Sequence, residues 1–368
     1  GSITESSRIK KIIPTIKLLL EKEAKIIILS HIGRPKGKII EGMSLEPISK
    51  KLASLLGKEV LFNKNIINNI AISEVNKIQS GSIMMLENIR FNQGEESNNI
   101  EFSKKLSNFG DIFVNDAFSC SHRFHASVEG ITKYIPSYFG LQITQEIEVL
   151  KKITSEIKRP VTLIIGGSKI STKINIINNL ARKFNNIIIV GGMANTMLKH
   201  TGSKVGKSIY ENDCASLVKE ILSISKKCDC NIICPIDAVV SKSIEGMGEK
   251  KDIKEINNDE MILDIGPKTI SLIKKIISGS STVLWNGPAG YFENPSFQTG
   301  TKEIIDIISQ KTINDNIFSV AGGGETVAAI NKFQKLDSFT FVSTAGGAFL
   351  EYLEGKSLPG IKALNYNV

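Results

Sequence analysis

The sequence predicts an α/β protein with two doubly wound, parallel-sheet domains. Short apolar runs rich in Ile and Val alternate with longer amphipathic stretches from one end of the chain to the other. Most of these runs are uninterrupted, as in strands that are buried on both faces of a parallel sheet. The 368 residues also exceed the roughly 250 to 300 at which a single hydrophobic core stops growing. Two domains are therefore expected.

The apolar runs and helical periodicity place the elements in order. Strands are expected at residues 25–30, 82–87, 112–115, 161–165, 186–190, 231–235, 261–264, 282–285, 318–321 and 339–343. Helices are expected at residues 9–20, 45–56, 143–157, 172–184, 215–226, 268–277 and 301–308. The charged amphipathic stretch 142–158 is followed by Arg159, Pro160 and a new strand, so the domain boundary is expected there. Both halves, of about 150 and 190 residues, are then of ordinary domain size.

The composition favours anionic partners, because 46 Lys and Arg against 37 Asp and Glu give a net charge of +9. Scattered lysines and only 6% aromatic residues disfavour a nucleic-acid-binding protein. No uninterrupted apolar run reaches the roughly 18 to 20 residues of a membrane span, so no membrane partner is expected. Five cysteines are an odd number, and the spacing of Cys228, Cys230 and Cys234 matches no zinc motif. A reducing, cytoplasmic location is expected.

Glycine-rich turns follow almost every predicted strand of the second half. They are Gly166-Gly167-Ser168-Lys169, Gly191-Gly192, Gly266-Pro267, Asn286-Gly287-Pro288 with Gly290, Gly322-Gly323-Gly324 and Gly346-Gly347. In a parallel sheet all six turns lie on the edge where ligands of open α/β folds bind. Glycines let backbone N–H groups approach a polyanion, and each following helix presents its positive N-terminal end. This edge is predicted to bind phosphate groups.

Charged residues follow several of these turns. Lys169 and Lys173 are four residues apart, so they are expected to share one helical face and either to reach the same phosphates or to be solvated. Glu293 and Glu325 could bind a ribose hydroxyl or a magnesium ion. The segment 202–208, GSKVGKS, is one residue short of a Walker A loop, and no G-x-G-x-x-G follows a strand. The missing fingerprint disfavours a dehydrogenase.

The first half carries basic residues in its loops instead of glycine runs. The expected strand ends lead to His31-Ile32-Gly33-Arg34-Pro35, to Arg90, and to Ser121-His122-Arg123-Phe124-His125, while Arg8 opens the first helix. Planar guanidinium groups suit bidentate binding of carboxylate and phosphate. The surrounding arginines disfavour a cation, so the histidines are interpreted as hydrogen-bond partners of an anion or of the fold rather than as metal ligands.

The motifs together resemble the bacterial type of phosphoglycerate kinase over essentially the whole chain. They are SHIGRPKG (30–37), LENIRF (86–91), VNDAF (114–118), SHRFHAS (121–127), GGSKISTKI (166–174), LDIGPKT (263–269), LWNGPAGYFE (284–293), AGGGET (321–326), STAGGA (343–348) and LEGKSLPG (353–360). The resemblance implies reversible phosphoryl transfer between ATP and the carboxylate of 3-phosphoglycerate, giving ADP and 1,3-bisphosphoglycerate. It also implies that the reaction uses magnesium and that the protein is a monomer.

The same resemblance implies a division of labour. Residues 1–141 are expected to bind phosphoglycerate, and a C-terminal segment, 353–368, is expected to pack back on them. Residues 142–158 are expected to form the hinge helix. Residues 159–352 are expected to bind the nucleotide. The implied substrate-binding residues are Arg8, His31, Ile32, Gly33, Arg34, Arg90 and Arg123. The implied nucleotide-binding residues are Lys173, Asn286, Gly290, Glu293, Gly322, Gly323, Gly324, Glu325 and Thr326. The implied catalytic residues are Arg8, Lys169, Lys173, Gly324 and Gly347, and Glu325 is the implied magnesium ligand.

Three features depart from the family pattern. The family begins with an R-V-D-F-N strand whose Asp and Asn contact phosphoglycerate, and this sequence starts after that point. We therefore expect a weakened first domain with poor or no activity, and the alternative is a truncated or noncatalytic binding protein of this family. Glu325 replaces the usual Asp, which moves the carboxylate by one methylene, and Ala345 replaces the first glycine of a usual T-G-G-G-A loop.

Overall fold

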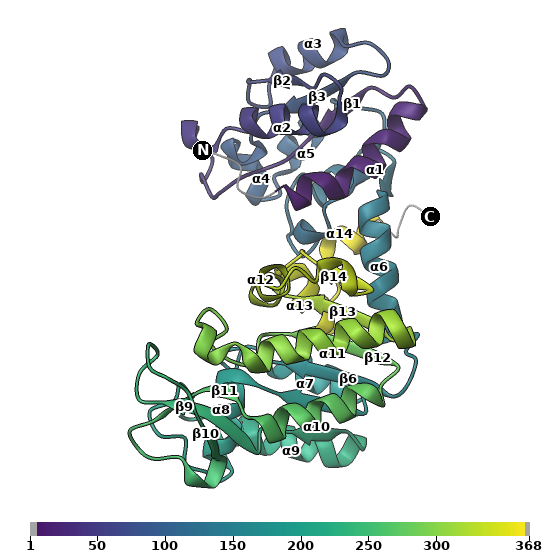
Figure 1. The fold of residues 1–368 in the computed structure, drawn as a ribbon. Coiled ribbons are helices and arrows are strands. Elements are labelled where there is room, and N and C mark those ends of the chain that lie inside the picture. The colour runs from purple at the N-terminus through teal and green to yellow at the C-terminus, as the bar shows by residue number, and fades with distance from the viewer. Residues whose placement is uncertain (1–5, 365–368) are drawn as a thin grey trace. The chain divides into compact units, whose positions relative to one another are not determined.

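The computed structural model describes residues 6–364 and divides the chain into two compact units (Figure 1). The described residues up to Ile147, together with those from Ser357 onward, form unit 1, and Glu148–Lys356 form unit 2. The division falls inside helix α6 (Leu141–Thr154). Residues 353–356, expected with the first domain, belong to unit 2 instead, because α13 (Gly347–Leu353) and the turn after it pack on that unit. The expected segment end, 365–368, lies outside the described residues.

Unit 1 consists of two small parallel sheets covered by helices. Its strands are β1 (Ile26–Ile28), β2 (Leu61–Asn63), β3 (Ile83–Leu86), β4 (Phe113–Asn115) and β5 (Ser137–Phe139), in the orders β1-β3-β2 and β4-β5. Its helices are α1 (Ser7–Glu21), α2 (Glu46–Leu56), α3 (Asn69–Lys77), α4 (Gln93–Glu96), α5 (Ile100–Ser107) and α14 (Pro359–Lys362). Alternate residues of β3 enter two separate apolar clusters, one with α1 and α2 and one with α3 and α5. A strand buried on both faces reads as a continuous apolar run.

The end of the chain returns to unit 1 through α14. The backbone N–H of Gly360 donates to the carbonyl oxygen of Ser121 at 2.8 Å. A side chain at position 360 would place a Cβ 2.7 Å from the Cγ1 of Val128. Ser121 begins the basic SHRFHAS segment and Val128 follows it, so α14 supports the loop that carries Arg123 and His125.

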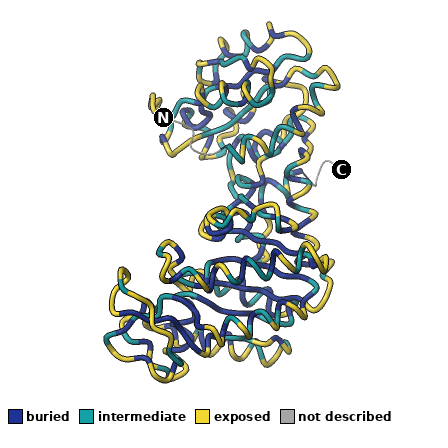
Figure 2. Tube along the Cα trace, viewed as in Figure 1, coloured by how far each residue is buried: buried dark blue, intermediate teal, exposed yellow. Residues whose placement is uncertain are grey.

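Unit 2 is built on a six-stranded parallel sheet in the order β14-β13-β12-β6-β7-β8. The strands are β6 (Val161–Ile165), β7 (Asn186–Ile189), β8 (Asn231–Ile233), β12 (Thr282–Asn286), β13 (Phe318–Gly322) and β14 (Phe341–Ser343). The helices are α7 (Ile174–Ala181), α8 (Gly191–His200), α9 (Ala215–Cys228), α10 (Pro267–Ser278), α11 (Thr299–Asp315), α12 (Gly324–Lys332) and α13. The strands are the buried layer of the unit (Figure 2). Trp285 of β12 is fully buried, and its ring stacks on Phe339 at 6.3 Å between centroids. The predicted α/β class with parallel sheets is confirmed.

A second sheet in unit 2 corrects one prediction. Strands β9 (Asp237–Ser241), β10 (Glu249–Asp252) and β11 (Met261–Ile265) form an antiparallel sheet in the order β10-β9-β11. The run at 261–264 was expected in the parallel sheet, but an apolar run does not reveal strand direction. The Gly266-Pro267 turn therefore follows a strand of the antiparallel sheet, and five of the six predicted turns follow strands of the parallel sheet.

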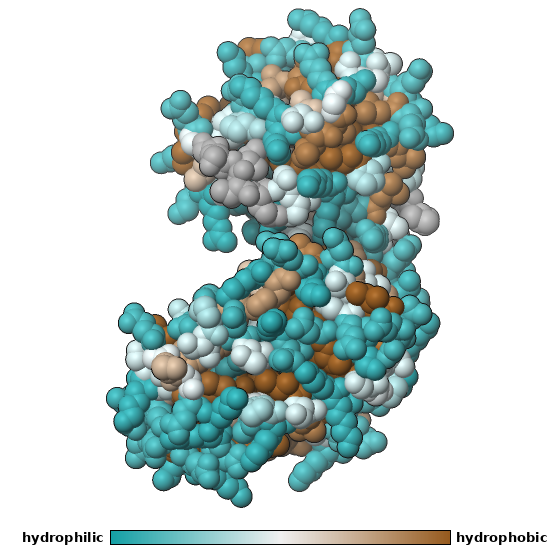
Figure 3. Space-filling view, in the orientation of Figure 1, coloured by the Kyte–Doolittle hydropathy of each residue, from teal (hydrophilic) through white to brown (hydrophobic). Residues whose placement is uncertain are grey.

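The surface matches the mixed composition of the chain. The visible face carries hydrophilic side chains over most of both units, interrupted by apolar patches (Figure 3). Within residues 6–364 no helix combines the length and the apolar character that crossing a membrane needs.

Candidate active site

The glycine turns of unit 2 pack backbone against backbone. Gly287 follows β12 with a φ of 112°, and a Cβ there would lie 2.3 Å from the carbonyl oxygen of Gly166. The N–H of Gly166 donates to the carbonyl oxygen of Asn286 at 2.9 Å, and that of Met193 donates to Gly167 at 2.9 Å. Only glycine permits this φ and this approach. The turns after β6, β7 and β12 therefore form one contiguous surface.

Lys173 joins two of these turns directly and a third through Asn286. Its Nζ donates to Asn286 Oδ1 at 2.6 Å and also to the carbonyl oxygen of Gly166, while Asn286 Nδ2 donates to the carbonyl oxygen of Gly322 at 2.7 Å. Burial lowers the pKa of the Lys173 ammonium to about 8, partly opposed by the charge of Glu325. The position differs from the prediction, because Lys173 precedes α7 as its N-cap and Lys169 lies in the turn before it. The two lysines do not share a helical face.

The turn after β13 completes this surface. Thr326 is buried, and its Oγ1 accepts a hydrogen bond from the N–H of Gly287 at 2.6 Å. A Cβ at Gly323 would lie 2.6 Å from Asn286 Nδ2. Gly324 and Glu325 begin α12 and are exposed. The structure thus brings Lys173, Asn286, Gly322, Gly323 and Thr326 together through direct contacts.

The other four predicted residues of unit 2 are not among these contacts. Lys169 and Glu293 are exposed, and Gly347 is the exposed first residue of α13. Gly290 packs instead on Asp264, whose Oδ1 would lie 2.5 Å from a Cβ at that position. Gly290 therefore shapes the loop between β12 and α11, where Asp264 also accepts the N–H of Gly300 at 2.7 Å.

Arg90 is the buried centre of the basic residues in unit 1. Its side chain is 3% exposed, and Nη1 donates to the carbonyl oxygen of Gly33 at 2.8 Å. Nε lies 3.6 Å from Glu96 Oε1, and the buried Nη2 has no hydrogen-bond partner among the residues described. A buried charged donor without an acceptor is costly, so this guanidinium is suited to an anionic ligand.

Electrostatic effects connect Arg90 to the other basic residues. Burial, and then the charges of Arg90 and Arg123, lower the pKa of His31 to about 4, with smaller effects from His125 and Arg8. Burial, Arg90 and Arg123 also lower the pKa of His125 to about 4. Both imidazoles are therefore neutral near pH 7. These five residues form the basic cluster of unit 1.

The two remaining predicted residues of unit 1 lie in the loop after β1. Ile32 contributes its backbone, because its carbonyl oxygen accepts from Asn88 Nδ2 at 2.8 Å. Arg34 is exposed. Asn88 also donates to the carbonyl oxygen of Met43 at 2.9 Å. The buried Asn88 amide is therefore hydrogen-bonded to the backbone of this loop at both residue 32 and residue 43.

Glu95 is a residue of this region that the sequence did not single out. Its carboxylate accepts from the Oγ of Ser127 at 2.6 Å and from the N–H of Ser127 at 3.0 Å, and lies 3.7 Å from Nδ1 of His125. Burial raises the pKa of this carboxyl, opposed by the Ser127 hydrogen bonds. Glu95 thereby holds the segment that carries Arg123 and His125. An acidic residue in a short helix carries no sequence signal for a contact with a serine 32 residues away.

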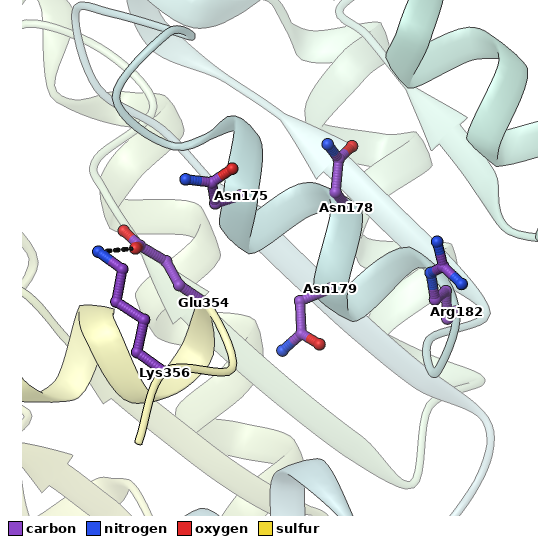
Figure 4. Close-up of a pocket in the computed structure, with 6 residues that line it drawn as sticks. All are labelled: Asn175, Asn178, Asn179, Arg182, Glu354 and Lys356. Carbon is purple, nitrogen blue, oxygen red and sulfur yellow. Dashed lines mark ion pairs between the residues drawn. The ribbon is translucent and has the colours of Figure 1, made fainter. Parts of the chain in front are cut away.

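A separate cavity of about 270 Å³ lies in unit 2 and is lined by Asn175, Asn178, Asn179, Arg182, Glu354 and Lys356 (Figure 4). The three asparagines project from α7, and Arg182 is the C-cap of that helix. Glu354 and Lys356 follow α13 and form an ion pair at 2.7 Å. Asn179 Nδ2 donates to the carbonyl oxygen of Leu353 at 2.7 Å, which fastens the end of α13 to α7. None of the predicted site residues lines this cavity.

The chain has two α/β units. One carries a cluster of arginines and neutral histidines, and the other carries lysines and glycine turns at the carboxyl edge of a parallel sheet. This combination is that of a two-domain phosphotransferase. Comparison with known proteins specifies the family. The family model for phosphoglycerate kinase matches residues 1–356. Phosphoglycerate kinases of Xanthobacter autotrophicus and a Chelativorans species are 43% and 45% identical over 366 residues, covering 99% of this chain and 92% of theirs.

Solved structures agree with this result. Phosphoglycerate kinase from Coxiella burnetii superposes with a TM-score of 0.91 at 36% identity, covering 100% of this chain and 92% of that one. The enzyme from Pyrococcus horikoshii gives 0.85 at 29% identity, covering 100% and 93%. The chain belongs to the phosphoglycerate kinase family. It is a kinase of glycolysis that transfers a phosphoryl group between ATP and 3-phosphoglycerate, and members of the family generally use Mg·ATP.

Proposed function

We propose that unit 1 binds 3-phosphoglycerate or 1,3-bisphosphoglycerate at its basic cluster, with Arg34 and the backbone of Ile32 and Gly33 at the margin. The observation that carries this assignment is the buried Arg90 guanidinium with an unpartnered Nη2. Carboxylate and phosphate oxygens are the acceptors that match a planar guanidinium. Neutral His31 adds a hydrogen-bond donor without adding charge to an already positive cluster.

In unit 2 the nucleotide is held by the joined turns. Lys169 and Lys173 neutralise phosphate oxygens, and the turns at Gly322 to Thr326 and at Gly347 present backbone amides at the beginnings of α12 and α13. Asn286, Gly290 and Glu293 shape the loop that receives the rest of the nucleotide. ATP and ADP share the phosphates that these groups contact.

Magnesium binding with the nucleotide involves Glu325. The donor set fits this ion, because Mg²⁺ is usually held by one or two carboxylates together with substrate phosphates. Glu325 is exposed in the first turn of α12, and its charge acts on the ammonium of Lys173. A bound magnesium ion would supply further neutralisation of phosphate charge. The carboxylate of Glu325 keeps the charge of the Asp that is usual in the family.

The chemistry needs no protein nucleophile. A carboxylate oxygen of 3-phosphoglycerate attacks the γ-phosphorus of ATP in line, the new oxygen–phosphorus bond forms, and the bond to the β-phosphate oxygen breaks to release ADP. Arg8, Lys169 and Lys173 neutralise the oxygens of the group in transfer. Because the two substrates bind to different units, the helix α6 region must act as a hinge during transfer. Such alignment accounts for about 7 to 11 kcal/mol of a barrier in favourable cases.

We also propose that the enzyme works as a monomer in the cytoplasm. The monomer follows the family pattern, and the location is supported by five free cysteines, two of which, Cys230 and Cys234, have thiol pKa values raised to about 12 by burial. Such thiols stay protonated and unreactive.

A coupled assay of ATP consumption that requires 3-phosphoglycerate tests the proposed function on this chain. We expect turnover that depends on both substrates and on magnesium. A chain that binds MgADP in a calorimeter but shows no turnover would instead be the noncatalytic binding protein. Turnover that continues without 3-phosphoglycerate would reject the assignment of unit 1.

A further inference from the structure

Glu211 lies between α8 and α9 and contacts the turn that carries the two lysines. Its Oε1 accepts from the Oγ of Ser171 at 2.6 Å, and its Oε2 accepts from the N–H of Ser171 at 2.9 Å. Both carboxylate oxygens thus accept hydrogen bonds from Ser171, and the backbone of Ile170 also donates to this carboxylate, which fixes its orientation. Ser171 lies midway between Lys169 and Lys173 in the sequence.

Hydrogen bonds within the turn connect Ser171 to both lysines. The hydroxyl of Thr172 donates to the carbonyl oxygen of Lys169 at 2.9 Å, and the N–H of Lys173 donates to Ile170 at 3.0 Å. The segment between the lysines is therefore a closed turn, with Ser171 exposed at its surface. A displacement of Ser171 would move the backbone of Lys169, which is itself exposed.

Glu211 is itself held firmly by α8. Its N–H donates to Thr196 Oγ1 at 3.1 Å, and its carbonyl oxygen lies 3.1 Å from Nε2 of His200. The same helix begins against the lysine turn, since a Cβ at Gly192 would lie 3.0 Å from the Cα of Ser168. Helix α8 thus contacts the lysine turn at Ser168 directly and at Ser171 through Glu211.

The charge of Glu211 is maintained at neutral pH. Burial alone would raise the pKa of its carboxyl, but the Ser171 hydrogen bonds and the nearby charge of Lys169 outweigh burial, and the pKa lies below its ordinary value. Hydrogen bonds to an ionised acceptor are about twice as strong as neutral ones. The hydrogen bonds between Ser171 and Glu211 are therefore stronger than hydrogen bonds between neutral groups.

We infer that Glu211 is a positioning residue for phosphoryl transfer: it fixes Ser171 and thereby directs Lys169 toward the terminal phosphates of the nucleotide. The inference rests on the proposed role of Lys169. Glu211 touches neither substrate, and its effect on the reaction passes through the turn. Its importance could not be recognised from local sequence, because Ser171 is 40 residues away.

The test compares Glu211→Gln, Ser171→Ala and the double variant with the parent chain. Glu211→Gln keeps the shape but replaces one acceptor by an amide donor, and Ser171→Ala removes only the hydroxyl bond. Glu220→Gln is the matched control, because Glu220 also accepts a bond from a neighbouring segment, from Asn178 Nδ2 at 2.6 Å, and is exposed outside the site. Steady-state kinetics and amide exchange of residues 166–173 are measured for each.

We expect Glu211→Gln to lower kcat about tenfold, the loss that corresponds to one charge-assisted hydrogen bond. The KM for 3-phosphoglycerate stays unchanged, amide exchange of residues 166–173 accelerates, and the Ser171→Ala effect is not additive with it. Kinetics within roughly twofold of the parent, or additive effects, overturn the inference.

Failure of the proposed function is distinguishable from failure of this inference. If the parent chain shows no turnover, MgADP affinity by calorimetry replaces kcat as the readout. Weaker MgADP binding by Glu211→Gln than by Glu220→Gln then supports the positioning role. Equal binding by the two variants overturns it.

Discussion

The two units present different kinds of groups to an anion. Unit 1 uses side chains: a buried guanidinium, Arg90, with neutral histidines around it. Unit 2 offers backbone, with turns so close that a Cβ at Gly287 would lie 2.3 Å from a neighbouring carbonyl oxygen. It adds two lysine charges, Lys173, which is held by Asn286 and Gly166, and the exposed Lys169. A small rigid acid suits directional guanidinium groups, whereas a polyphosphate chain suits many backbone amides together with lysine charges. The two units should therefore fail under different kinds of substitution.

The largest effect is expected in unit 2 when a charge is removed. Lys173→Met abolishes the ammonium that joins the turns at Gly166 and Asn286. We expect kcat to fall about 10²- to 10³-fold, as for loss of one preorganised electrostatic group, with the KM for 3-phosphoglycerate unchanged. Single-turnover kinetics checks this, and the exposed Lys226→Met is the control. Normal phosphoryl transfer by Lys173→Met would remove Lys173 from the mechanism.

A smaller effect, with the opposite selectivity, is expected in unit 1. Arg90→Lys keeps the charge but loses the fork, including the buried Nη2. We expect the KM for 3-phosphoglycerate to rise about 30-fold, equivalent to about 2 kcal/mol, while the KM for ATP is unchanged. Initial rates with each substrate varied in turn measure this. The exposed Arg182→Lys serves as control, and equal changes in both KM values would contradict the division between units.

The pH response sharpens the same comparison. Burial lowers the pKa of Lys173 from 10.5 to about 8, so its ammonium loses its proton as the pH rises above 8. We expect kcat/KM for the nucleotide to fall about tenfold per pH unit there, since this parameter reports the free enzyme. The histidines of unit 1, with pKa values near 4, stay neutral over this range and add no alkaline change.

Lys173→Arg provides the control for this pH profile. A guanidinium keeps its proton throughout the range, so the variant should lose the alkaline decrease even if its rate is lower. A decrease that persists in Lys173→Arg assigns the titration to another group.

The smallest effect is expected from a methyl group added to the backbone of unit 2. Gly287→Ala forces an alanine into a φ of 112° and against the carbonyl oxygen of Gly166. We expect a loss of about 2 kcal/mol in the free energy of unfolding and a severalfold higher KM for ATP. Denaturant unfolding measures the first. Gly279→Ala is the control, because its φ is negative and its Cβ would meet no atom closer than 3.7 Å. Equal free energies of unfolding for the two variants would contradict the tight packing of the turn at Gly287 against the turn at Gly166.

The strands of unit 2 could be predicted from sequence where burial is complete. Strand β6 is buried at every position, so its apolar run marked both ends correctly. Strand β10 has the sequence EKKD and is largely exposed, so it carried no apolar signal, and the pairing of β11 with β9 could not be read from a run of apolar letters. Local patterns report burial, while strand direction depends on partners elsewhere in the chain.

The candidate site shows the same limit. Glycine turns and arginines after strands are local signals, so the sequence predicted the loops that carry Lys173 and Arg123. The carboxylates that hold those loops were not, because Glu95 and Glu211 act on serines 32 and 40 residues away. A pairing across such a distance exists only once the strands have brought the loops together.

The return of α14 to unit 1 has a consequence for how the chain is made. Gly360 supports Ser121 beside the segment of Arg123 and His125, yet it is separated from that segment by the whole of unit 2. During synthesis from the N-terminus, every residue of unit 2 leaves the ribosome before Gly360 does. The basic loop of unit 1 therefore gains the support of Gly360 only after all of unit 2 has been synthesised.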